Sequence, residues 1–165
     1  MTDSDKKHFT RPTPDYLRPL SHMKILHSDA LRVSINETDL TLSVTDVRSD
    51  TVWQMQAEGP GDIGIRGHCG PWQGMSFREA QTRRWETSDT SATCTLTGWG
   101  YSANVWSPLG FGVTVNFRLR NDRLTVALAP HLPEQFEASL IDSHYPRGFL
   151  FPKGSKGRLV LPYCQ

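Results

Sequence analysis

The chain has 165 residues, of which 37% are hydrophobic, 21% are charged and 10% are aromatic. This composition is typical of one globular domain with its own core, and it argues against a disordered chain and against long helices. The 18 basic and 17 acidic residues nearly balance. No net field therefore draws the chain to nucleic acid or to an anionic membrane, and neither partner is expected.

The N-terminal region predicts an extended arm followed by a single domain. Residues 1–20 carry three prolines, no periodicity and no apolar run of the secretory type, so the domain is expected over 21–165. No run reaches the roughly 18 apolar residues of a membrane helix. The odd number of widely spaced cysteines, Cys69, Cys94 and Cys164, favours reduced thiols. We therefore expect a cytoplasmic protein.

The first clear β-pattern lies between Leu31 and Trp53. Apolar side chains occupy every second position at 31–35 and again at 40–44, as in strands with one buried face. Polar breaks follow each run, at 36–39 and 46–50. The stretch therefore predicts strand, turn, strand, turn, strand.

The middle of the chain is richer in loops. Residues 56–74 hold six glycines and two prolines around the alternation of Ile63 and Ile65, which predicts loops around a short strand. Residues 77–80 suit a helical turn, and the polar run 81–91 suggests no element. The alternation of Cys94, Leu96 and Gly98 with threonines predicts a strand over 92–99.

The second half contains the clearest hairpin. Alternating apolar residues at 113–119 and 124–128 flank an Asn121-Asp122 turn. Residues 130–137 break this pattern, and short strands are expected at 136–141 and 159–161. Strands about ten residues apart with turn signals between them predict an antiparallel sandwich or barrel.

Sequence signatures of catalysis and metal binding are missing. The chain lacks the nucleophile elbow, the P-loop, the H-E-x-x-H motif and the dinucleotide glycine pattern. Only His68 and Cys69 place two metal-ligand types together, whereas zinc needs three or four converging ligands. We therefore expect no metal and no cofactor.

Carboxylates are the groups that glycoside hydrolysis would need, as a facing pair. None of those in the sequence has a context that aims it at a partner, and most have polar neighbours, as on a solvated face. The candidates considered are Asp62, Glu79, Glu86, Asp89, Glu134, Glu137 and Asp142. No catalytic residue is therefore expected in this chain.

Aromatic side chains are better candidates for ligand contact. These aromatic residues lie in or beside glycine-rich or polar segments, where an exposed ring can carry the apolar face of a sugar: Trp72, Trp85, Trp99, Tyr101 and Trp106. Packing in the core is the alternative for each, and it is the expectation for Trp53. Arg147, between Pro146 and Gly148, is expected to brace a loop or to pair with a carboxylate at a domain interface, and ligand binding is the alternative.

Two segments resemble a known family. The run TLSVTDVRSDTVW is similar to the opening hairpin of galactose-mutarotase-like β-supersandwich domains, with Asp50 where that pattern usually has Gly, and HYPRGFLFPKGSKGRLVLPYCQ resembles the segment that leads from such a sandwich toward a catalytic barrel. The resemblance implies an all-β, mostly antiparallel β-sandwich of the supersandwich type. It also implies that catalytic carboxylates belong to a barrel.

These observations lead to one expected function and two alternatives. We expect a non-catalytic N-terminal β-sandwich domain of a carbohydrate-active, glycoside hydrolase-like protein, which packs on a catalytic barrel and contributes to a sugar site. Its expected partners are a carbohydrate and either that barrel or a second copy of the chain. The alternatives are a small β-barrel that binds an apolar ligand and an autonomous carbohydrate-processing enzyme.

Overall fold

The computed structural model describes residues 22–57, 61–67, 73–99, 111–131 and 138–150. Within these ranges the chain is built from strands and one short 3₁₀ helix, η3, over Phe77–Glu79. The strands are β1 (Met23–His27), β2 (Leu31–Asn36), β3 (Leu42–Asp46), β4 (Thr51–Met55), β5 (Ile63–Gly67), β6 (Gln73–Met75), β7 (Ala80–Thr87), β8 (Ser91–Trp99), β9 (Gly112–Arg120), β10 (Arg123–His131), β11 (Ala138–Ser143) and β12 (Phe149–Leu150).

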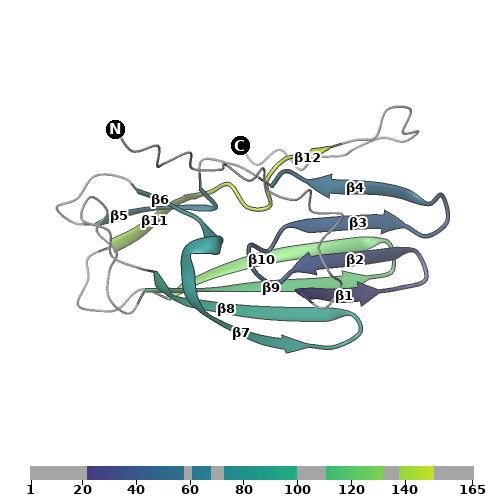
Figure 1. Cartoon of the computed structure of the whole chain (residues 1–165), viewed down its shortest axis with the longest axis horizontal. Coiled ribbons are helices and arrows are strands. Elements are labelled where there is room, and N and C mark those ends of the chain that lie inside the picture. The colour runs from purple at the N-terminus through teal and green to yellow at the C-terminus, as the bar shows by residue number, and fades with distance from the viewer. Residues whose placement is uncertain (1–21, 58–60, 68–72, 100–110, 132–137, 151–165) are drawn as a thin grey trace, which may run out of the picture.

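The strands form three antiparallel sheets (Figure 1). Sheet A has five strands in the order β1-β2-β3-β4-β12, and sheet C has four in the order β10-β9-β8-β7. Sheet B is smaller, with the order β11-β5-β6, and lies toward one end of the molecule in Figure 1. Neighbours in the sequence are therefore mostly neighbours in a sheet.

The hydrophobic core lies between sheets A and C. Along β2, β8 and β9 the side chains of one face are buried, as in the run Ala92, Cys94 and Leu96 of β8. These side chains belong to one cluster with the inward residues of sheet A, including Val33 and Val44. The all-β, mostly antiparallel sandwich is confirmed. Trp53 packs against the same cluster, in agreement with its expected role in the core.

The turns of the two predicted hairpins are also present. Asn121 joins β9 to β10 with a φ of 49°, and Asp50 precedes β4 with a φ of 53°. Both angles lie in the left-handed region, which glycine adopts freely and which Asn and Asp tolerate better than other residues. Asp50, the residue that replaces Gly in the family-like pattern, therefore occupies a position that favours glycine.

Several sequence expectations need correction. The polar run 81–91 contains most of β7, β1 was not predicted, and Pro130 lies within β10 rather than breaking it. Proline is better tolerated there than in a central strand because β10 is an edge strand, on which the N–H groups that point away from the sheet make no ladder bond. Gly98, expected to face inward, is exposed with a φ of 72°.

Other expectations are close to what is observed or cannot be compared. The helical turn at 77–80 corresponds to η3, and the strand expected at 136–141 corresponds to β11 with shifted ends. The expected arm at 1–20 and the strand at 159–161 lie outside the described residues.

Candidate functional site

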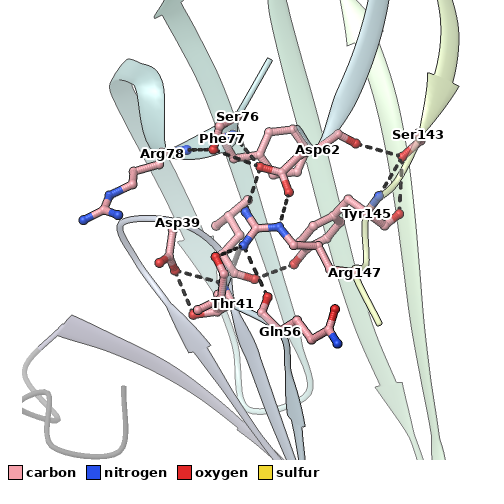
Figure 2. A network of polar contacts seen from close by, with 12 residues as sticks. Asp39, Thr41, Gln56, Asp62, Ser76, Phe77, Arg78, Ser143, Tyr145 and Arg147 are labelled. Carbon is pink, nitrogen blue, oxygen red and sulfur yellow. Dashed lines mark hydrogen bonds and ion pairs between the residues drawn. The ribbon is translucent and has the colours of Figure 1, made fainter. Parts of the chain in front are cut away.

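A buried polar network links the loops that precede β5, η3 and β12 (Figure 2). At its centre, Asp62 has no exposed surface and Arg147 is 9% exposed. Asp62 leads into sheet B, whereas Arg147 lies just before β12 in sheet A. The network therefore ties sheet B to the edge of sheet A.

The ion pair between these residues has a bidentate geometry. Arg147 donates from Nε to Oδ1 of Asp62 at 2.8 Å and from Nη2 to Oδ2 at 3.0 Å. Its remaining nitrogen, Nη1, donates to the carbonyl oxygens of Gln56, at 3.3 Å, and of Ala57. The planar guanidinium thus binds a carboxylate with one edge and the two residues that follow β4 with the other.

Asp62 also organises the start of η3. Its Oδ2 accepts a hydrogen bond from the backbone N–H of Phe77 at 2.7 Å and from the hydroxyl of Ser76 at 3.3 Å. Ser76 caps the helix in turn, since its Oγ accepts from the N–H of Arg78 and its own N–H donates to Glu79. A single carboxylate therefore fixes both the ion pair and the helix cap.

The backbone of Asp62 adds links to two further segments. Its N–H donates to the carbonyl of Met75 at 2.8 Å, and its carbonyl accepts from the N–H of His144 at 2.9 Å. Because β6 ends at Met75 and β11 ends just before His144, these bonds hold the two outer strands of sheet B against the same residue.

Tyr145 extends the network into the core. Its hydroxyl donates to the carbonyl of Leu40 at 2.7 Å, and its ring packs on Phe77 and Phe117 with centroid distances of 5.0 and 6.3 Å. Burial, with a smaller effect from the negative charge of Asp62, raises the pKa of the Tyr145 hydroxyl well above its usual value. Tyr145 therefore acts as a neutral donor.

The geometry suits a structural role better than acid–base chemistry. Both oxygens of Asp62 already accept hydrogen bonds, and no part of the side chain reaches the surface. A general acid or base must come within hydrogen-bond reach of its substrate. A sugar cannot reach Asp62 unless the network opens.

Two of the candidate ligand-binding residues reach this region. Trp99 is 8% exposed, donates from its indole N–H to the carbonyl of Ser76 at 2.9 Å and packs on Phe111. Arg147 pairs with a carboxylate, as expected, but that carboxylate belongs to Asp62 in the interior of the described structure and not to an interface between domains. Ser76 therefore connects Trp99 to the Asp62–Arg147 pair.

The remaining candidates are not brought to this region by any described contact. Trp72, Tyr101 and Trp106 lie outside the described residues, so their role as sugar contacts stays a prediction. Trp85 is half-buried against the core, and its indole nitrogen has no hydrogen-bond partner in the described part of the chain.

Sequence reasoning missed the central residue of the network. Asp62 was considered with six other carboxylates and given no partner, but the structure aims it at Arg147. The two residues are 85 positions apart, and Tyr145 is 105 positions from Leu40. No local spacing pattern signals contacts of this kind, whereas the isolated Arg147 in a proline- and glycine-flanked segment did suggest a carboxylate partner.

Comparisons with known proteins add no assignment. No model of a known protein family matches the chain, and no curated protein sequence matches it either. Among the described residues, no three histidine, cysteine, aspartate or glutamate side chains gather closely enough to hold a metal ion. No helix in that part of the chain is long and apolar enough to cross a membrane.

Proposed function

We propose that this chain is a non-catalytic β-sandwich domain of a carbohydrate-active, glycoside hydrolase-like protein. In this proposal it packs on a catalytic barrel and lends side chains to the rim of a sugar site. Aromatic rings are suited to that rim, because they can carry the apolar face of a sugar while polar neighbours bind its hydroxyl groups.

The observation that carries the proposal is the way the Tyr145-Pro146-Arg147 segment is built into the sandwich. This segment is part of the run that resembles the passage from a sandwich to a barrel. Tyr145 and Arg147 are 5% and 9% exposed and reach Leu40 and Asp62 respectively. A segment anchored in this way fixes the position from which the chain continues. A domain that packs on a neighbouring domain needs such a fixed connection.

The hydrogen bonding of Asp62 supports the non-catalytic part of the proposal, because both of its carboxylate oxygens already have partners. Asp62 is a buried carboxylate paired with an arginine, and its hydrogen bonds hold the fold together. Retaining or inverting hydrolysis instead requires two carboxyl groups that flank an accessible bond.

The proposal is tested by mixing the full chain with a panel of oligosaccharides and chromogenic glycosides. We expect oligosaccharides to change the tryptophan fluorescence, a weaker response in Trp72→Ala and Trp106→Ala, and no hydrolysis. Val47→Ala is the control, because Val47 is an exposed apolar side chain outside the candidate set. Absence of binding to every sugar, or hydrolysis that a carboxylate substitution abolishes, contradicts the proposal.

A further inference from the structure

The three sheets of the described structure have six edge strands, and five of these carry a feature that hinders the addition of a further strand. An edge presents unpaired N–H and C=O groups, which proteins commonly protect by short length, bulges or charged side chains. β6 and β12 have only three and two residues, and β11 contains a bulge. β7 carries the exposed Arg84 and Glu86, and in β1 the charged Lys24 lies on the same face as the buried Leu26.

β10 is the edge strand without such protection. It pairs with β9 along nine residues with no register shift, and none of the residues between Arg123 and His131 is charged. Proline also hinders strand addition, and Pro130 does so at one end of β10. The stretch Arg123–Ala129 remains free of proline, so it is a long, regular and largely apolar edge.

The backbone groups that point outward from β10 follow from the pairing of β9. The N–H of Leu119 donates to the carbonyl of Thr90, which lies on the β8 side, and N–H groups alternate between the two sides of a strand. The even-numbered residues of β9 therefore direct their backbone groups toward β10, where the residues opposite them are odd-numbered. The N–H and C=O groups of Leu124, Val126 and Leu128 consequently point away from β9. Because β10 ends sheet C, they have no ladder partner among the described strands.

The side chains of the same three residues are only partly covered. Leu124, Val126 and Leu128 pack against the core on the inner side of sheet C, but each is half-buried. On the adjacent β9, Val115 and Phe117 are at most 1% exposed. The difference arises because sheet C ends at β10, which leaves the far side of each side chain without a neighbour from the same sheet. A further strand with apolar residues on this side completes their burial.

The sequence of β10 is symmetric in the way that self-pairing requires. The three outward-facing residues are centred on Val126, so an antiparallel pair about a twofold axis there places Leu124 opposite Leu128 of a second copy. Each outward N–H then meets an outward carbonyl. A register shifted by two residues instead brings Pro130, which has no N–H, or Asp122 of the turn into the ladder. A single register therefore uses every outward-facing N–H.

From this unprotected and self-complementary edge we propose that β10 pairs with β10 of a second copy in antiparallel orientation, so that the two four-stranded sheets join into one. Arg123, the charged residue of the paired stretch, then lies opposite Ala129 of the second copy on the exposed face of the sheet, so no charge is buried and no like charges meet. Main-chain hydrogen bonds and the covering of the three apolar side chains hold the pair together. This inference does not depend on the proposed function, because it concerns only contacts between copies of this chain.

Sedimentation velocity of the full chain tests the proposal from about 10 μM to about 1 mM, the range in which a weak complex dissociates. We expect a concentration-dependent monomer–dimer equilibrium. Substitutions of the exposed Ala129 test the register, because this residue lies opposite Arg123 of the second copy. Ala129→Arg should raise the dissociation constant about threefold or more, and Ala129→Glu should lower it by a similar factor. Thr82→Arg and Thr82→Glu are the matched controls, since Thr82 is exposed on the other edge strand of sheet C and should leave the constant unchanged.

Disulfide trapping tests the pairing directly. In the proposed register Thr125 lies opposite Ala127 of the second copy in a pair without main-chain hydrogen bonds, where the Cα atoms are about 4.5 Å apart and a disulfide fits. With Cys69 and Cys164 replaced by serine, a mixture of the Thr125→Cys and Ala127→Cys chains should give a disulfide-linked dimer on oxidation with copper phenanthroline. A mixture of the Thr82→Cys and Ala127→Cys chains should not.

Three results overturn the proposal. The first is a chain that stays monomeric at about 1 mM. The second is a dimer whose dissociation constant responds equally to the substitutions of Ala129 and of Thr82. The third is an equal yield of disulfide-linked dimer from the two mixtures of cysteine variants, which would place the contact between copies away from β10.

Discussion

At the scale of single residues, the Asp62–Arg147 pair shows what a buried charge requires. Removing two charges from water is costly, and their attraction offsets that cost only when the remaining hydrogen-bonding groups also find partners. Here the carboxylate accepts from Phe77 and Ser76, while the guanidinium also donates to Gln56 and Ala57. The pair is therefore held by its surroundings as well as by its own attraction.

Substitution of Asp62 by asparagine should destabilise the fold strongly. Asp62→Asn leaves the guanidinium of Arg147 buried without a counter-charge, which costs about 3–5 kcal/mol in the free energy of unfolding. Urea denaturation measures this loss. The control is Asp46→Asn, which removes the partner of Arg48 in an exposed ion pair and should change stability little. Equal urea midpoints for the two variants would show that the buried pair has no such role.

Alkaline pH should destabilise the protein through Tyr145. Burial raises the pKa of its hydroxyl above the ordinary value of 10.0, so at high pH the tyrosine of the unfolded chain ionises while that of the folded chain stays neutral. Its contribution to stability is complete below a pH of about 10 and is lost as the pH rises further, by about 1.4 kcal/mol per pH unit.

The pH dependence of urea unfolding in Tyr145→Phe isolates this effect. The variant loses the hydrogen bond to Leu40, worth about 1 kcal/mol at neutral pH, but its stability should fall less steeply than that of the wild type above pH 10. Cys94, whose pKa burial raises from 9.0 to about 12, adds a loss of the same sign in both proteins. If the stability of the wild type and of Tyr145→Phe falls in parallel above pH 10, the loss of stability at alkaline pH belongs to other groups.

At the scale of elements, β7 depends on a side chain that reaches across to sheet A. Arg83 donates to the carbonyls of Thr38, at 3.0 Å, and of Phe77 and Arg78, at 3.0 and 2.7 Å. Thr38 lies in the turn between β2 and β3, and the other two carbonyls belong to η3. The guanidinium of Arg83 therefore links the edge strand β7 to the β2–β3 turn of the opposite sheet and to η3.

Removing this contact should weaken the attachment of β7. Arg83→Ala leaves three carbonyls without their charged donor and should lower the free energy of unfolding by about 1–3 kcal/mol. Arg84→Ala is the matched control, because Arg84 is the next residue on the same strand and is exposed, with one ion pair to Glu86 at 3.5 Å. Thermal unfolding distinguishes the two variants, and similar losses in both would contradict the role given to Arg83.

The same strand shows how far sequence patterns predict this fold. Strands β2, β3, β8 and β9 bury one whole face, so their apolar residues alternate and were predicted. On β7 only Ala80 is fully buried, and Arg83, Trp85 and Thr87 stand opposite the buried residues of β8, so the apolar alternation disappears. The edge strand β1 was missed for the same reason, because Leu26 is its only fully buried residue.

The candidate site was less predictable than the strands. Arg147 was singled out from its flanking residues, and Trp99 from its glycine-rich surroundings. Asp62 was not, because its partners Phe77 and Arg147 are 15 and 85 positions away along the chain. Contacts between residues of two different sheets produce no periodic pattern in the sequence. They can therefore be identified only in the three-dimensional structure.

At the scale of the whole molecule, sheet B depends on the sandwich in a way that sheets A and C do not. Sheets A and C bury a common core, whereas the described residues join sheet B to the rest largely through Ile63, Met75 and the bonds around Asp62. Regions with few buried contacts open at lower free energy than the core of the same protein. Sheet B should therefore open before the long strands do.

Hydrogen exchange followed by mass spectrometry makes this order of opening measurable. In the wild type, amides of β5 and β11 should exchange faster than those of β2, β8 and β9, because the latter strands line the main core. Asp62→Asn should accelerate exchange in sheet B and at η3 first, since it releases Phe77, Ser76 and Arg147 together. Asp46→Asn should leave this order unchanged, because its ion pair is confined to the exposed turn after β3. Uniform acceleration in all three sheets would instead mean that sheet B and the sandwich unfold as one cooperative unit, so that the ion pair stabilises the whole molecule rather than the attachment of one sheet.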